Sequence, residues 1–148
     1  MRSVLALGLM GGLASLLTAC EQPAELAVDH AWVRLAAVPG RPAAAYFTVH
    51  GGPAPATLIS VTTDVAIKSE MHETMTKGGM AQMAPLQRVE IPANTDVAFK
   101  PGGRHVMLFD VNPGIARGRK IDFTFAFADG TRILHNADVI AAGDPGGQ

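Results

Sequence analysis

Cysteine is almost absent from this sequence, since Cys20 is the only one among 148 residues. A single cysteine cannot close an intrachain disulfide, and it cannot supply the several thiolates that structural zinc sites use. Basic residues are not in excess either, because 12 Lys and Arg stand against 13 Asp and Glu. The formal net charge of -1 excludes the basic footprint of a nucleic-acid-binding protein, so no nucleic-acid partner is expected.

Long amphipathic helical periods are also missing after residue 20. Charged residues make up only 17% of the chain and hydrophobic residues 48%, which is too apolar for a disordered protein. The length suits a single domain. No Ser/His/Asp pattern, paired carboxylates or phosphate-binding loop stands out, so we expect a protein that is not an enzyme.

The N-terminus contains a targeting segment. Met1-Arg2 is followed by an uncharged, mostly apolar run from Ser3 to Ala19, which is too short for a comfortable membrane span. The run ends in Leu17-Thr18-Ala19-Cys20, which resembles a bacterial lipobox. That resemblance implies a signal peptide over residues 1–19, cleavage before Cys20 and acylation of Cys20. Residues 20–25 would then form a tether and residues 26–148 the domain. An ordinary signal peptide with a coincidental cysteine is the alternative.

The remaining chain has the pattern of an all-β protein. Alternating apolar residues, β-branched content and turn residues predict about eight strands, which indicates a β-sandwich or partly open barrel. Trp32 is the expected core anchor. The Pro101-Gly102-Gly103 turn is expected to join its flanking strands in a hairpin, and residues 73–81 are expected to form a loop. The predicted strands are residues 26–35, 44–50, 57–63, 65–72, 97–100, 105–111, 121–128 and 131–140.

Methionine and histidine gather in one stretch of the chain. Seven methionines occur, and all except Met1 and Met10 lie between Met71 and Met107. His72 and His105 lie in the same stretch. Thioether sulfur is a soft donor and imidazole a borderline one, so two of each suit Cu(I) better than Zn, Mg or Ca. The stretch therefore predicts a copper site.

Strand alternation sorts these residues by face. His105 and Met107 are two residues apart on a predicted strand and should project from the same face. Met71 should lie on the face opposite His72 and is expected to pack in the core. Met75 and Met80 are either mobile donors near the site or plain packing residues.

The other histidines, His30, His50 and His135, are isolated in the sequence. Each is expected to make a surface or turn hydrogen bond rather than a metal bond. The cluster Arg117-Gly118-Arg119-Lys120 is expected to be a solvated loop.

A family resemblance rests on the spacing of four residues. Ten residues separate His72 from Met83, twenty-one separate Met83 from His105, and one separates His105 from Met107. This pattern resembles the ligand signature of the PCu(A)C family of periplasmic copper chaperones. Two further segments carry the resemblance: Pro101-Gly102-Gly103-Arg104-His105-Val106-Met107-Leu108 and the earlier Ala31-Trp32-Val33-Arg34.

The resemblance implies a fold, a ligand set and a function. The fold would be a single-domain, cupredoxin-like Greek-key β-sandwich or partly open barrel. One Cu(I) ion would be held by His72, Met83, His105 and Met107, in a periplasmic protein anchored to the membrane through Cys20. The copper acceptor would be the dinuclear centre of cytochrome c oxidase subunit II, with a Sco-type thioredoxin-like protein as a further expected partner.

Three other functions are weighed against copper delivery. An electron-transfer cupredoxin needs a Cys thiolate at its blue copper site, and none is available after Cys20. A copper buffer would use the same ligands without delivering the metal. A metal-free surface lipoprotein would use its Met-rich loop as an adaptable protein-binding patch.

Overall fold

The computed structural model describes residues 24–147. The signal peptide predicted for residues 1–19, the acylation site Cys20 and the first part of the predicted tether lie outside the described residues. No helix among residues 24–147 is long and apolar enough to cross a membrane. The described chain forms ten strands: β1 (Ala27–Arg34), β2 (Ala43–His50), β3 (Ala56–Thr62), β4 (Ala66–Lys77), β5 (Met80–Pro85), β6 (Val89–Ile91), β7 (Asp96–Phe99), β8 (Arg104–Val111), β9 (Lys120–Phe127) and β10 (Arg132–Ile140).

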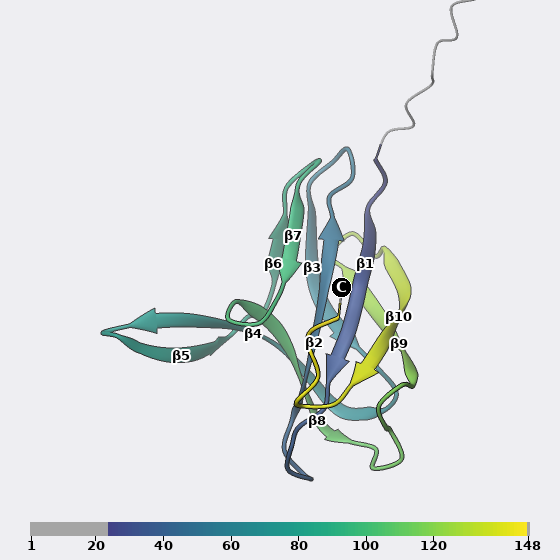
Figure 1. Cartoon of the computed structure of the whole chain (residues 1–148). Coiled ribbons are helices and arrows are strands. Elements are labelled where there is room, and N and C mark those ends of the chain that lie inside the picture. The colour runs from purple at the N-terminus through teal and green to yellow at the C-terminus, as the bar shows by residue number, and fades with distance from the viewer. Residues whose placement is uncertain (1–23, 148) are drawn as a thin grey trace, which may run out of the picture.

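All ten strands belong to one sheet that folds over on itself (Figure 1). Nine of them follow the order β5-β4-β8-β2-β1-β10-β9-β3-β6, and β7 pairs with β2 beside this path. Phe47 on β2 stacks on Phe99 at 4.2 Å between ring centroids and meets the edge of Phe125 on β9 at 4.8 Å. Because β2 and β9 are not neighbours in the strand order, the contact between Phe47 and Phe125 crosses the core between two layers. The all-β prediction is confirmed.

Period-two alternation explains which residues form the core. On β9, Ile121, Phe123, Phe125 and Phe127 are buried, and Lys120 and Asp122 on the other face are exposed. On β2, the alternating residues Ala45, Phe47 and Val49 are likewise buried. A strand with one apolar face must cover that face against a second layer, so these two strands fix the interior of the molecule.

The segment predicted as a Met-bearing loop is a β-hairpin, so the loop prediction for residues 73–81 is wrong. β4 continues to Lys77, and Lys77 pairs with Met80 on β5. Between them Gly78 and Gly79 both have positive φ, at 58° and 77°. Two successive glycines in this conformation make the tight turn that matches the twist of a hairpin. Figure 1 shows this β4–β5 hairpin extending sideways from the rest of the sheet.

The Pro101-Gly102-Gly103 turn does not close a hairpin, which corrects the second prediction. β7 and β8 both pair antiparallel with β2, at residues 96–99 and 106–108 respectively. They therefore run in the same direction along β2, as one strand interrupted by the turn. After the interruption, β8 pairs with β2 on one side and, along most of its length, with β4 on the other.

Met71 and Met75 lie on the same face of β4 but differ in burial. Met71 is buried in the core, whereas Met75 on the hairpin is 48% exposed. We expect Met71→Ala to lower the free energy of unfolding by about 2–5 kcal/mol, because it leaves a cavity. Met75→Ala should change it by about 0.5 kcal/mol or less. Urea unfolding of both variants measures the difference, and equal stabilities would contradict this difference in burial.

Candidate metal centre

The two histidines predicted as ligands lie directly opposite each other. His72 on β4 and His105 on β8 are cross-strand partners in an antiparallel ladder. Their rings are stacked, with 5.9 Å between centroids and an interplanar angle of 27°. Residues 33 positions apart in the chain are thus brought to one point by strand pairing alone.

The strand register places both predicted methionine ligands on the same face as the two histidines. Met107 lies two residues after His105 on β8, opposite Glu70. Met83 on β5 lies opposite Thr74, which is two residues after His72 on β4. Because partners across a ladder share a face, and residues two apart share a face, all four side chains project to one side. We call this side of β5, β4, β8 and β2 the outer face.

A backbone carbonyl in the turn before β8 orients His105. Nδ1 of His105 donates a hydrogen bond to the carbonyl oxygen of Gly103 at 3.0 Å. The amide of Thr74 donates to the same oxygen at 3.1 Å, which ties the turn to β4. Since a carbonyl only accepts hydrogen bonds, the neutral ring carries its proton on Nδ1 and keeps the Nε2 lone pair free.

In His72 the available ring nitrogen is Nδ1, in contrast to Nε2 in His105. Nε2 of His72 lies 3.4 Å from Oε2 of Glu70, a weak hydrogen bond to a neighbour on the same face. Nδ1 is buried and has no hydrogen-bond partner among the described residues. A buried nitrogen without a partner is costly unless another group uses its lone pair. The lone pair of Nδ1 is therefore free to bind a metal ion.

Glu70 adds negative charge beside this pair. Its carboxylate lies 2.8 Å from Nζ of Lys68. The hydrogen bonds from Lys68 and then from His72 lower the pKa of Glu70, so this carboxyl group is ionised at neutral pH. A nearby carboxylate favours a cation at His72 over a neutral ligand.

Exposure rises from the imidazoles to the hairpin. His105 is 6% exposed and Met107 is half-buried, whereas Met83 is 60% exposed. Met83 stands on the projecting β4–β5 hairpin, and Met107 stands on the body of the sheet. One soft donor is thus readily accessible from solvent while the two nitrogens are shielded.

The remaining methionines do not join this group. The other three methionines lie on the opposite face of the β4–β5 ladder. Met71 and Met75 are an odd number of residues from His72 on β4, and Met80 pairs with Lys77, which is also an odd number of residues away. Met71 is buried as expected from the alternation. Met75 and Met80 are exposed, and their side chains leave the hairpin on the face opposite Met83.

Aromatic side chains continue the outer face beyond His105. The ring of Tyr46 on β2 lies 6.5 Å from that of His105 and 4.4 Å from that of Trp32 on β1. Trp32 is buried, but it lies outside the main hydrophobic core. The prediction that Trp32 anchors the core is therefore wrong: the bulge in β1 before Trp32 and its register opposite Tyr46 place it on the outer face.

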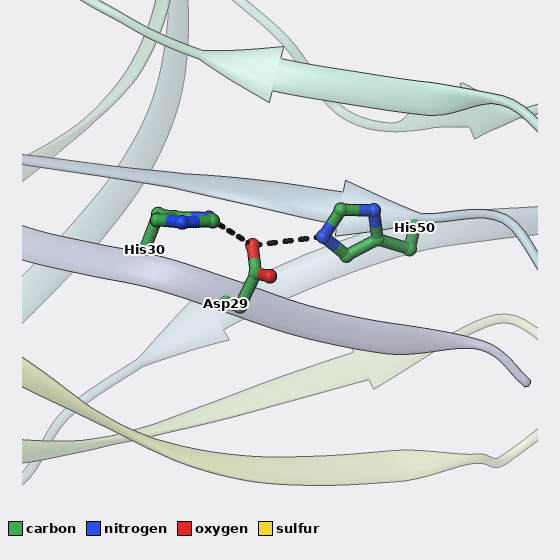
Figure 2. Close-up of side chains that lie close together, drawn as sticks. All are labelled: Asp29, His30 and His50. Atoms are coloured by element: carbon green, nitrogen blue, oxygen red, sulfur yellow. Dashed lines mark hydrogen bonds and ion pairs between the residues drawn. The ribbon is translucent and has the colours of Figure 1, made fainter. Parts of the chain in front are cut away.

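Sequence reasoning missed one group of possible ligands. His30 and His50 were expected to be isolated, yet Figure 2 shows both imidazoles turned toward the carboxylate of Asp29. His30 follows Asp29 directly, and His50 comes from the neighbouring strand. Only the pairing of β1 with β2 brings them together, so no spacing in the sequence could have identified them.

A family model supports the sequence resemblance. Residues 26–139 match the family described as "Putative lipoprotein LpqE-like". A curated relative, "Putative lipoprotein Lxx21020" of Leifsonia xyli subsp. xyli, is 33% identical over 130 residues, which cover 84% of this chain and 78% of the relative.

Solved structures similar to this chain carry PCuAC domains. The solution structure of CuI-DR1885 from Deinococcus radiodurans superposes with a TM-score of 0.61 at 29% identity, and the match covers 80% of each chain. The copper-bound PCuAC domain from PmoF2 superposes with a TM-score of 0.64 at 21% identity, covering 81% of this chain and 98% of that domain. These likenesses confirm the cupredoxin-like fold. The chain belongs to the LpqE-like lipoprotein family and has the fold of PCuAC domains.

Proposed function

We propose that this protein is a lipid-anchored copper chaperone that carries one Cu(I) ion on its outer face. The ligands are His72, Met83, His105 and Met107. The observation that carries the proposal is the register of β5, β4 and β8, which directs two imidazoles and two thioethers to one side. The solution structure of CuI-DR1885 from Deinococcus radiodurans, which this chain resembles, supports the choice of metal.

The donor set suits a carrier in an oxidising compartment. Thioethers need no deprotonation to bind copper and cannot form disulfides. They are weaker ligands than thiolates, so copper can leave by stepwise exchange. Met83 is the most exposed of the four residues and stands on the projecting hairpin, which makes it the first ligand that an acceptor can replace. The shielded imidazoles would then release the ion last.

The proposed acceptor is the dinuclear copper centre of cytochrome c oxidase subunit II, with a Sco-type thioredoxin-like protein as a second partner. Acylation of Cys20 would hold the domain at the periplasmic side of a membrane, near such an acceptor. Several acyl chains give durable anchoring, because each buried methylene contributes about 0.8 kcal/mol.

Replacing single methionines tests the ligand set. Met83→Leu removes a soft donor while keeping an apolar side chain of similar size, and we expect it to weaken Cu(I) affinity at least about tenfold. Met107→Leu should do the same. Titration of Cu(I) against a competing chelator measures the change, and X-ray absorption on the loaded protein should report two sulfur neighbours in the wild type and one in each variant.

Met75→Leu is the matched control for Met83→Leu. It makes the same chemical change on the same exposed hairpin, but on the face away from His72. Its Cu(I) affinity should equal that of the wild type. If both variants lost affinity equally, the copper would not be bound on the outer face. If neither lost affinity, the metal-free binding surface would be the better account of the exposed methionines.

Protons should compete with Cu(I) for this site. An imidazole binds metal through a neutral nitrogen, so protonation of either ring blocks a ligand. We expect Cu(I) affinity to fall as the pH is lowered from neutral to mildly acidic. Chelator competition at a series of pH values measures it, with the proton binding of the chelator accounted for. A flat response would argue against histidine ligation.

Transfer to the acceptor separates a chaperone from a buffer. The Cu(I)-loaded protein is mixed with the metal-free soluble domain of subunit II, the two are separated, and copper is measured in each. Because protein-to-protein exchange needs no free ion, copper should reach the acceptor in the presence of a chelator that captures released Cu(I). Retention of copper by the donor protein, or its appearance only on the chelator, would indicate a buffer.

A further inference from the structure

A second group of metal-binding side chains lies on the outer face, away from the proposed copper site. It consists of Asp29 and His30 on β1 and His50 on β2 (Figure 2). One ligand atom from each residue lies within 4.8 Å of the others. His50 lies four residues after Tyr46 on β2, which corresponds to about 13 Å of strand. The group is therefore separate from the His72 and His105 pair.

A strained backbone position creates this group. Successive residues of a regular strand point to opposite faces, so Asp29 and His30 should point apart. The ladder between β1 and β2 shifts its register between Asp29 and Trp32, and His30 has a φ of 50°. This bulge brings Nδ1 of His30 to 2.6 Å from Oδ1 of Asp29. Left-handed backbone at a residue other than glycine is uncommon and often marks a functional position.

A second carboxylate orients His50. Asp96 on β7 accepts a hydrogen bond from Nδ1 of His50 at 2.7 Å. Nε2 of His50 then points toward Asp29, with 2.8 Å between Nε2 and Oδ1. This buried nitrogen makes no hydrogen bond of acceptable geometry within residues 24–147. A carboxylate that holds one ring nitrogen and leaves the other for a metal is the usual support of a histidine ligand.

The group attracts positive charge before any metal binds. The carboxylates of Asp29 and then Asp96 raise the pKa of His50. Burial alone would raise the pKa of Asp29, but the imidazoles of His50 and His30 outweigh that effect and lower it. Two carboxyl groups and two imidazoles thus converge on one small region, where a divalent cation can replace a proton.

We propose that Asp29, His30 and His50 form a second metal site, which binds a divalent cation such as Zn(II) or Cu(II). The ligands are a carboxylate oxygen of Asp29, Nδ1 of His30 and Nε2 of His50. Asp96 is a positioning residue that holds the ring of His50. Imidazole and carboxylate donors suit these divalent ions, whereas the thioether-containing site suits Cu(I). The two sites would therefore separate metals by oxidation state and softness.

The side chains have room to adjust to an ion. Ligand atoms about 2.0–2.2 Å from a zinc ion lie about 3.3 Å from one another in tetrahedral geometry. The present contacts of 2.6 and 2.8 Å must therefore open by about half an ångström. The side chain of His30 is 63% exposed and that of Asp29 is 43% exposed, so both can move. Their solvent-facing side leaves a position for water as the fourth ligand.

Zinc binding to the full chain tests the proposal. Zn(II) is titrated into the purified protein, its affinity is measured by calorimetry, and NMR follows the ring nitrogens of each histidine. We expect the signals of His30 and His50 to shift together with the first equivalent. His30→Asn should weaken that binding at least about tenfold, since a metal ligand is lost. Asparagine also tolerates the left-handed backbone, so this variant should fold normally.

His135→Asn is the matched control, because His135 lies outside the group of three. It should bind Zn(II) like the wild type. Cu(I) affinity of His30→Asn should also match the wild type, which distinguishes this site from the copper site. Three results would overturn the proposal: signal shifts confined to His72 and His105, unchanged zinc affinity in His30→Asn, or an equal loss in His135→Asn.

Discussion

The pairing of β4 with β8 is the constraint on which the candidate copper site depends. It places His72 directly opposite His105 and puts Met107 on the same side. A slip of one residue on either strand would turn that strand's ligands into the core and expose its apolar residues. Burial of Met71, Val106 and Leu108 on the inner face therefore fixes the geometry of the outer face. The same strand register thus determines both which residues form the apolar core and which donors face outward.

The outer face holds two donor groups of different character. The first joins thioethers to imidazoles beside the projecting hairpin, and the second joins carboxylates to imidazoles beside the start of β1. Between them lie Tyr46 and Trp32, whose rings pack at 4.4 Å. The first group stands on β4, β5 and β8 and the second on β1 and β2, so one sheet supports soft and hard donors at separate places.

Much of this arrangement could be predicted from the sequence. Alternation predicted strands at residues 44–50 and 121–128, where β2 and β9 lie, and it correctly placed Met71 opposite His72, because a strand with one buried face has a strict period of two. The four copper ligands were predicted from residue type and from the resemblance of their spacing to the PCu(A)C signature, and the register gives them a common face. Their role in binding copper stays a prediction.

What the sequence could not predict depends on pairing between distant segments. The hairpin of β4 and β5 was missed because its exposed residues do not alternate between apolar and polar. The glycines before His105 predict a hairpin turn between β7 and β8, whereas the partner of β7 is β2. The group around Asp29 was missed because a bulge reverses the direction of His30, and bulges leave little trace in a single sequence.

The four proposed copper donors do not stand on equally rigid supports. His72, His105 and Met107 lie where β4, β8 and β2 pair side by side. Met83 lies on β5, the terminal strand of the sheet, whose one partner within residues 24–147 is β4. A small flexing of this two-stranded arm would carry one sulfur away while the other three donors kept their mutual positions. The coordination number of a bound ion could then drop from four to three mechanically, without any loss of the folded core.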